Sequence, residues 1–283
     1  ETALAISKKN WPYRPTCVIT HGVNPGLVSH FVKQALLNMA ADTGRPVRTP
    51  TTREEWGQLA QSLDAKVIHI AERDTQVADR PKQRDEFVNT WSVYGFVGEG
   101  SQPSELGWGT HERHWPEDGR KHPHGCQSAI YLDRPGVSVQ VRSWTPLEGP
   151  YNGFLITHNE SISISDYFTL RDGDQVTYRP TVHYAYHPCD DAVLSLHEYS
   201  GRGYKMQNDV RLMMNEITSG MGELGVLIGG NEKGAYWYGS RLTIEQARDL
   251  APFNGATTLQ TTAGVLSGVI WALENPDRGV IEP

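Results

Sequence analysis

The middle of the chain carries the pattern that most restricts its fold: short apolar or alternating segments typical of β-strands, with helix-like segments on both sides. Strands are expected at 66–71, 130–132, 137–141, 154–168 and 181–186. The second and third flank residues 133–136, Asp-Arg-Pro-Gly, which are typical of a hairpin turn. Helices, then a mixed sheet, then helices predict an α/β chain in which a mixed, largely antiparallel sheet is flanked by helices.

Start and stop signals mark the helices. Asn24 is expected to cap a helix that has Pro25 in its first position. A helix is also expected at 208–219, and a last one at 256–275 that ends before Pro276. Capping-box spacing marks two further starts, at Thr52 with Glu55 and at Thr243 with Gln246.

The last predicted helix has two kinds of face. Gly264 and Gly268 lie one turn apart and predict close packing against a neighbouring element. Apolar side chains share another stripe at helical spacing: Leu259, Ala263, Leu266, Ile270 and Leu273.

Composition disfavours several functional classes. The net charge of −7 disfavours binding to a phosphate backbone, so no nucleic-acid partner is expected. No stretch reaches the roughly 18 apolar residues of a membrane-spanning helix, so no membrane partner is expected. The three cysteines are odd in number and far apart, and no secretory signal pattern is present, which together favour a cytoplasmic location.

Histidines and one cysteine gather between residues 111 and 126, but their spacing matches no zinc pattern. The residues are His111, His114, His122, His124 and Cys126. A solvated loop is favoured there, and no metal site is expected. The chain also contains no G-x-G-x-x-G, no Walker A motif and no G-x-S-x-G.

His158 and Glu160 are the first candidates for chemistry. If 154–168 is a strand, both side chains lie on one otherwise apolar face with Ile156 and Ile162. A buried His–Glu pair must be satisfied or used, and such pairs mark general acid–base sites. The alternative is a core histidine paired with a structural carboxylate.

Glu72 follows Ile68 and Ile70 on one strand face and is expected at the end of that strand. Strand ends in α/β folds are places where ligands gather. The alternative is a strand-terminal salt bridge with Arg73 or another basic residue.

Residues 89–100, with the sequence NTWSVYGFVGEG, combine aromatic side chains, glycines and one carboxylate. The face of Trp91 attracts an ammonium group, and a carboxylate such as Glu99 adds a charge-assisted hydrogen bond. A linear diamine needs both features. From composition alone, however, an aromatic core strand followed by a glycine loop is favoured.

Eight segments, spread over nearly the whole chain, carry a resemblance to the bacterial homospermidine synthases. They are HGVNPG (21–26), AERDTQ (71–76), NTWSV (89–93), QPSELGWGTHE (102–112), THNE (157–160), YRPT (178–181), HYAYHP (183–188) and AYWYGS (235–240). The strings are long and unusual, so the match is specific. Tyr94, where an acidic residue is expected, and the run 253–258 depart from the family pattern.

The resemblance implies a saccharopine dehydrogenase-like fold and an activity. Tightly held NAD would serve the transfer of an aminobutyl group from putrescine or spermidine to putrescine, with release of ammonia or diaminopropane through imines. Residues 1–20 would be a remnant of a dinucleotide-binding (Rossmann) domain whose remainder is expected to be missing. Residues 21–242 would form the catalytic and dimerisation domain of a homodimer, and 243–283 would be helices that return to the dinucleotide-binding domain.

The same resemblance assigns the site residues. Glu72, Trp91 and Glu99 would line a polyamine pocket and take part in catalysis. Asn24, with His21 and Pro25 in the same turn, would lie near the nicotinamide. His158 and Glu160 would transfer or position protons.

Two other functions stay open from the sequence. A related carboxyspermidine or saccharopine-type dehydrogenase would need cationic residues for a substrate carboxylate, whereas the candidates are acidic and aromatic. As it stands, the chain is also compatible with an inactive dimerisation or polyamine-binding module with negligible affinity for NAD.

Overall fold

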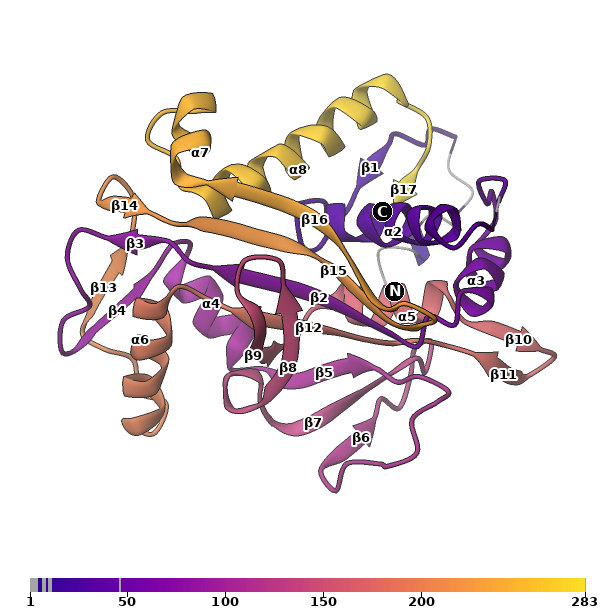
Figure 1. Ribbon diagram of the computed structural model, residues 1–283, viewed down its shortest axis with the longest axis horizontal. Helices are drawn as coiled ribbons and strands as arrows, with labels where there is room; N and C mark the ends of the chain where they lie inside the picture. Colours follow the sequence, from indigo (N-terminus) through magenta and orange to yellow (C-terminus); the bar gives the residue numbers. More distant parts are fainter. Residues whose placement is uncertain (1–4, 7–8, 10–11, 46, 283) are drawn as a thin grey trace.

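One mixed β-sheet forms the centre of the molecule (Figure 1). The computed structural model describes residues 5–6, 9, 12–45 and 47–282. The strand order is β16-β15-β2-β12-β5-β7-β6, with β9 also paired to β12 and β8 paired to β9. The β2–β12 pair is parallel and the other pairs are antiparallel, which confirms the predicted mixed, largely antiparallel sheet. Its strands are β2 (Val67–Asp74), β5 (Pro103–Gly107), β6 (Gly119–Lys121), β7 (Ala129–Pro135), β8 (Gln140–Thr145), β9 (Gly149–Ile156), β12 (Thr181–His187), β15 (Met221–Asn231) and β16 (Gly234–Thr243).

Helices and small two-stranded sheets surround this sheet. The helices are α2 (Leu27–Asp42), α3 (Arg53–Ser62), α4 (Val93–Gly100), α5 (Asn159–Tyr167), α6 (Asp190–Gly201), α7 (Ile244–Leu250) and α8 (Ala256–Glu274), with a 3-10 turn at Gly136–Ser138. The small sheets pair β1 (Cys17–Val18) with β17 (Val280–Ile281), β3 (Val77–Ala78) with β14 (Ile217–Ser219), β4 (Glu86–Asn89) with β13 (Asp209–Leu212), and β10 (Leu170–Asp172) with β11 (Gln175–Tyr178). None of the helices among these described residues is long and apolar enough to cross a membrane.

Strand β2 shows how the sequence places its side chains between layers. Ile68 and Ile70 are fully buried and belong to one hydrophobic cluster with residues of α2 and α4. Glu72 continues this row, because alternate residues of a strand share a face. Arg73 points to the opposite face, where β8 covers β2. The row therefore carries Glu72 into the layer between sheet and helices.

Several predicted elements are confirmed. Both capping boxes form, at the starts of α3 and α7. The last helix runs over Ala256–Glu274, within one residue of the predicted range. Strands also occur where 66–71 and 181–186 predict them, as β2 and β12.

The long strand predicted at 154–168 is wrong. Strand β9 ends at Ile156, and α5 begins at Asn159 with His158 as its extended N-cap. The serines explain the difference, because Ser161 and Ser165 lie one helical turn apart and both are fully buried. An added side-chain carbon on Gly107 of β5 would come within 2.3 Å of Ser165, so small residues let this helix lie directly on the sheet.

The helix predicted at 208–219 is also wrong. The segment instead forms β13 and β14, and β13 pairs in parallel with β4. Buried Arg211 holds it there, with Nε 2.8 Å from Glu86 and a second contact to Glu216. Glu86 is distant in the sequence, and the turn between β13 and β14 brings Glu216 close to Arg211. Tertiary pairing of the segment therefore overrides its local helix preference.

Two smaller expectations also fail. Residues 133–136 do not join a hairpin, since β7 pairs with β5 and β6 while β8 pairs with β9. Helix α2 begins at Leu27 with Gly26 as its N-cap at φ 134°, so Asn24 does not cap it and Pro25 is not its first residue. A turn from Gly22 to Gly26 precedes the helix and presents Asn24 to the sheet.

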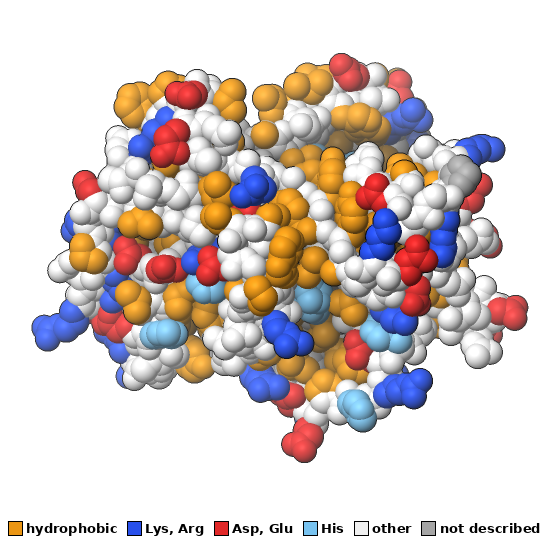
Figure 2. Space-filling model, viewed as in Figure 1, with side chains coloured by type: hydrophobic (Ala, Val, Ile, Leu, Met, Phe, Trp, Pro, Cys, Tyr) orange, Lys and Arg blue, Asp and Glu red, His pale blue; other side chains and the backbone are white. Residues whose placement is uncertain are grey.

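Helix α8 meets the rest of the molecule through small and polar residues. An added carbon on Gly264 would lie 2.3 Å from the carbonyl oxygen of Gly22, and one on Gly268 would lie 3.1 Å from His21, which confirms the predicted close packing. The apolar stripe points outward instead. Its members Leu266, Ile270 and Leu273 are exposed, and so are Val265 and Val269 beside them. Hydrophobic side chains accordingly gather over α7 and α8 in Figure 2.

Candidate functional site

Glu72 is the buried acid at the centre of the candidate site. It is 5% exposed, accepts a hydrogen bond from Asn24 Nδ2 at 3.1 Å and another from the hydroxyl of Tyr184. Burial raises the pKa of Glu72 to about 7, because desolvation outweighs the two hydrogen bonds that favour its ionised form. A carboxyl with this pKa can exchange a proton near neutral pH.

Glu72 differs from two expectations, one about its place in the strand and one about a salt bridge. Strand β2 continues to Asp74, so Glu72 lies inside the strand and not at its end. Arg73 does not pair with Glu72 but with Glu148 and Asp190, on the other face of the sheet. Among the described residues, no other Lys, Arg or His forms an ion pair with Glu72 either, so the salt-bridge alternative is wrong.

An aromatic wall lies beside Glu72; we use this name for Trp91, Phe96, Tyr184 and Tyr186. Trp91 Nε1 donates to the hydroxyl of Tyr186 at 2.8 Å, and the rings of Tyr184 and Tyr186 stack with centroids 5.4 Å apart. The ring of Phe96 packs 5.5 Å from Trp91 and 5.4 Å from Tyr186. The wall therefore holds the partly buried indole of Trp91 in one orientation.

The local structure around Trp91 differs from the favoured composition-based interpretation. Strand β4 ends at Asn89, and α4 begins at Val93 with Ser92 as its N-cap. Trp91 thus lies in the connection between a strand and a helix, and the glycines belong to that helix. This places Glu99 two turns along α4, with a side chain 38% exposed.

His158 lies between two carboxylates. Its Nε2 is 3.6 Å from Glu99 and its Nδ1 is 3.6 Å from Glu160, distances that make ion pairs but are too long for hydrogen bonds. Burial alone would lower the pKa of His158, but the two carboxylates outweigh it and raise that pKa to about 10. Desolvation raises the pKa of Glu160, which is 1% exposed. The two carboxylates therefore favour the cationic form of His158.

Edge contacts join these groups into one cluster. The ring of His158 lies 4.7 Å from that of Tyr184, which itself donates to Glu72. A chain of contacts thus runs from Asn24 through Glu72, Tyr184 and His158 to Glu99. The pairing of His158 and Glu160 on a strand face is wrong, since both belong to the start of α5, yet both are buried next to the other candidates.

His21 and Pro25 hold the turn that carries Asn24. His21 Nδ1 lies 2.8 Å from the carbonyl oxygen of Gly264 on α8, and Pro25 accepts a hydrogen bond from the backbone of Gly22 at 2.6 Å. Of the three residues predicted near a nicotinamide, Asn24 is the one whose side chain bonds Glu72.

The histidine-rich loop forms local pairs. His111 lies beside Glu112, and His122 contacts Glu105. Within the ranges described above, no three His, Cys, Asp or Glu side chains converge as metal ligands would.

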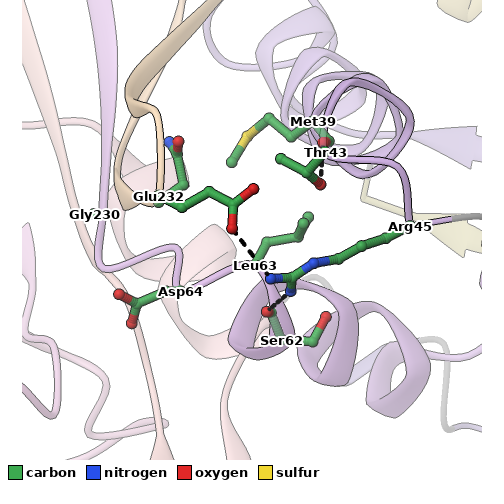
Figure 3. Close-up of a pocket in the computed structure, with 9 residues that line it drawn as sticks. Met39, Thr43, Arg45, Ser62, Leu63, Asp64, Gly230 and Glu232 are labelled. Carbon is green, nitrogen blue, oxygen red and sulfur yellow. Dashed lines mark hydrogen bonds and ion pairs between the residues drawn. The ribbon is translucent and has the colours of Figure 1, made fainter.

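The pocket in Figure 3 lies elsewhere, at the ends of α2 and α3 and the β15–β16 turn. It encloses about 250 Å³ and is lined by none of the candidate residues. Arg45 crosses it, bonding the carbonyl of Ser62 and lying 3.6 Å from Glu232. The pocket is not the candidate site, because none of the candidate residues lines it.

Tyr184 and Tyr186 are the residues that pattern reasoning missed. They alternate along β12 and share the face of Ile70 and Glu72, with Tyr184 level with Ile70 and Tyr186 level with Glu72. The signal was available as an alternating Val-x-Tyr-x-Tyr row, but only the parallel pairing of β12 with β2 shows what the hydroxyls reach.

Comparisons with known proteins agree with one another. A sequence model for the saccharopine dehydrogenase C-terminal domain matches residues 22–283. Homospermidine synthase of Blastochloris viridis is 58% identical over 284 residues, covering 100% of this chain and 59% of that protein. Homospermidine synthase of Mesorhizobium japonicum is 52% identical over 284 residues, covering 99% and 59%.

A solved structure also matches. The crystal structure of a homospermidine synthase from Legionella pneumophila in complex with NAD is 55% identical, with a TM-score of 0.97, and the match covers 100% of this chain and 61% of that one. The chain thus spans about 59% of the length of the curated relatives that it matches.

Proposed function

The chain belongs to the saccharopine dehydrogenase C-terminal domain family, and on that premise we propose that it is the catalytic portion of an NAD-dependent homospermidine synthase. In the proposed reaction one putrescine transfers its aminobutyl group to a second putrescine. Ammonia leaves, imines are the intermediates, and no net redox change occurs. The observation that carries the proposal is a buried carboxylate joined through Tyr184 and Tyr186 to a fixed indole, in a chain 58% identical to a homospermidine synthase along its whole length.

The diamine fits the site by charge and shape. One ammonium group would pair with Glu72, and Glu99 at the exposed side would receive the other. The carbon chain and the cationic imine would lie against the face of Trp91, where cation–π attraction is worth about 0.5–2 kcal/mol. Spermidine, which carries the same terminal aminobutyl group, is the other donor included in the proposal.

Proton transfer is assigned to Glu72. An amine must lose its proton before it can be oxidised or attack an imine, and a base with a pKa near the working pH is best suited. The pKa of about 7 meets that condition for Glu72, whereas the neighbouring carboxylates raise the pKa of His158 away from neutrality. We therefore propose that His158 and Glu160 position Glu99 and balance its negative charge. Of the two roles expected for them, proton transfer or positioning, this proposal keeps positioning.

The residues of this chain fit one part of NAD, the nicotinamide, and not its pyrophosphate. Bound NAD supplies hydride acceptance and return. Asn24 beside Glu72 would face the nicotinamide, supported by the turn of His21 and Pro25. The first amide groups of α2 already bond within that turn, Leu27 to Gly22 and Val28 to Val23, so they offer no phosphate cradle. The pyrophosphate would therefore be bound by a dinucleotide domain of the complete enzyme.

The domain roles belong to the same proposal. Residues 1–20 would border the dinucleotide domain and 243–283 would pack against it, with 21–242 as the catalytic and dimerisation domain. Pairing of β1 with β17 and the outward apolar stripe of α8 support this division. A homodimer in the cytoplasm is included as the expected assembly and location.

The product test is direct. The full-length protein that carries this chain, supplied with NAD and putrescine, is expected to yield homospermidine and ammonia in equal amounts, measured by mass spectrometry and an ammonia assay. NADH should not accumulate, because the hydride is returned. Net NADH release without homospermidine would instead indicate a dehydrogenase of the related type.

Binding of putrescine is expected to strengthen as pH rises through 7. The raised pKa means that Glu72 is largely protonated at pH 6 and ionised at pH 8, and only the ionised form attracts the ammonium group. For a single group with pKa about 7, Kd should fall about tenfold between those pH values, with proton release at the lower one. Calorimetry on the full-length protein loaded with NADH, so that putrescine is not oxidised, measures both. A Kd that does not change with pH would contradict the assignment.

A further inference from the structure

Asp74 is a second buried carboxylate on the face of Glu72, two residues further along β2. It is 1% exposed, and no Lys, Arg or His among the described residues forms an ion pair with it. All of its partners are uncharged donors. They are Thr90 Oγ1 at 2.5 Å, the backbone nitrogen of Gln76 at 2.9 Å, Gln76 Nε2 at 3.0 Å and Thr257 Oγ1 at 3.4 Å.

These partners belong to segments that build the site from different parts of the chain. Thr90 directly precedes Trp91 in the connection between β4 and α4. Thr257 lies in the first turn of α8, and Gln76 Oε1 accepts from the backbone nitrogen of Ala256 at 2.8 Å. One carboxylate therefore ties together the strand of Glu72, the loop of Trp91 and the helix that holds the Asn24 turn.

The surroundings of Asp74 suit a carboxylate, which can accept several hydrogen bonds at once. Four donors converge on the two oxygens of Asp74, and an anion is also favoured near the N-terminus of a helix. Burying an unpaired carboxylate is costly, so its retention beside the site calls for a role that an apolar residue would not fill.

We propose that Asp74 is a positioning residue of the diamine site, which orients Trp91 through Thr90 and anchors α8 through Gln76 and Thr257. The inference deepens the proposed function and rests on it for the identity of the ligand. The contacts themselves do not depend on that identity.

The charge of Asp74 has a second effect on the same site. Two carboxylates on one strand face repel each other, and this repulsion adds to burial in raising the pKa of Glu72. Removal of the Asp74 charge should therefore let Glu72 ionise at lower pH. A purely structural carboxylate elsewhere in the fold would not have this effect.

The first test follows Glu72 without reference to activity. In the full-length protein labelled with carboxyl-¹³C glutamate, Asp74→Asn is expected to lower the apparent pKa of Glu72 by about one unit. Glu72→Gln assigns the signal, and Asp79→Asn, at an exposed position directly after β3, is the matched control. Equal Glu72 titrations in Asp74→Asn and Asp79→Asn would overturn the electrostatic part of the proposal.

The second test addresses Trp91 and avoids the risk that Asp74→Asn fails to fold. Thr90→Val keeps the shape of the side chain but removes the donor, whereas Thr90→Ser keeps the donor. The valine variant is expected to shift the indole N–H resonance of Trp91, identified with Trp91→Phe, and to lower kcat about tenfold, which serine should restore. An unmoved resonance and unchanged kcat in Thr90→Val would overturn the positioning role.

The two tests separate the inference from the proposed function. If the unsubstituted protein forms no homospermidine, the proposed function fails, while the Glu72 titration and the Trp91 resonance still decide the role of Asp74. If product forms but neither signal responds, the role of Asp74 fails alone.

Discussion

Replacing Trp91 with alanine is expected to lower kcat for homospermidine formation at least about 30-fold. The indole face would stabilise the cationic imine more than the bound diamine, and a loss of about 2 kcal/mol of cation–π attraction corresponds to that factor. The fold should survive, because Trp91 is only partly buried and lies in a connection between elements.

The control variants divide this effect into its causes. Trp91→Phe keeps an aromatic face but loses the 2.8 Å bond to Tyr186, so it should retain more activity than alanine. Trp144→Ala, at a 38% exposed position on β8, should leave kcat unchanged. Steady-state kinetics with thermal unfolding of each variant measures the outcome. Full activity in Trp91→Ala would remove the cation–π role altogether.

Replacing Glu72 with glutamine should weaken putrescine binding about 100-fold, or close to 3 kcal/mol. The reason is its burial, since an ammonium group brought beside Glu72 is shielded from water and depends on that carboxylate for its counter-charge. Glu99→Gln is the matched comparison, because Glu99 is 38% exposed and screened by solvent and should cost only a few-fold. Calorimetry at pH 8 with NADH-loaded protein measures both.

Stability provides an independent check on Glu72→Gln. A folded-state pKa of about 7, above the usual value of 4.5, means that the folded state holds the proton more tightly than the unfolded state does. Stability is therefore lost as pH rises from about 4.5 to 7, and at pH 8 the carboxylate carries the full cost. Glutamine removes that cost, so the variant should unfold at the same or a higher temperature than the unsubstituted protein at pH 8. Weaker binding together with lower stability would indicate a damaged fold.

The sequence correctly predicted those features that depend only on residues close together in the chain. The capping boxes at Thr52 and Thr243 and the glycine face of α8 need only residues within a turn of one another. The alternating row of Ile68, Ile70 and Glu72 likewise identified a buried acid before any partner was known. These features are written in short stretches of sequence.

The failures have a common cause in long-range packing. Residues 159–167 alternate between polar and apolar side chains as a strand does. They form a helix instead, because the buried Ser161 and Ser165 let it pack closely against Gly107. Residues 208–219 have the pattern of a helix, but Arg211 pairs with Glu86 on another strand and the segment forms strands instead. The roles of Tyr184 and Tyr186 also depend on which strand lies next to β12. No pattern within one segment contains that information.

The outward stripe of α8 also has a consequence for anyone who purifies this chain. An exposed apolar ridge runs along this helix and consists of Val265, Leu266, Val269, Ile270 and Leu273. Such exposed apolar surfaces promote self-association and precipitation in water. Lysine or glutamate at Leu266 and Ile270 should improve solubility with little loss of stability, because both side chains are already about half exposed. Aggregation of the isolated chain would then reflect this ridge and not a defect in folding.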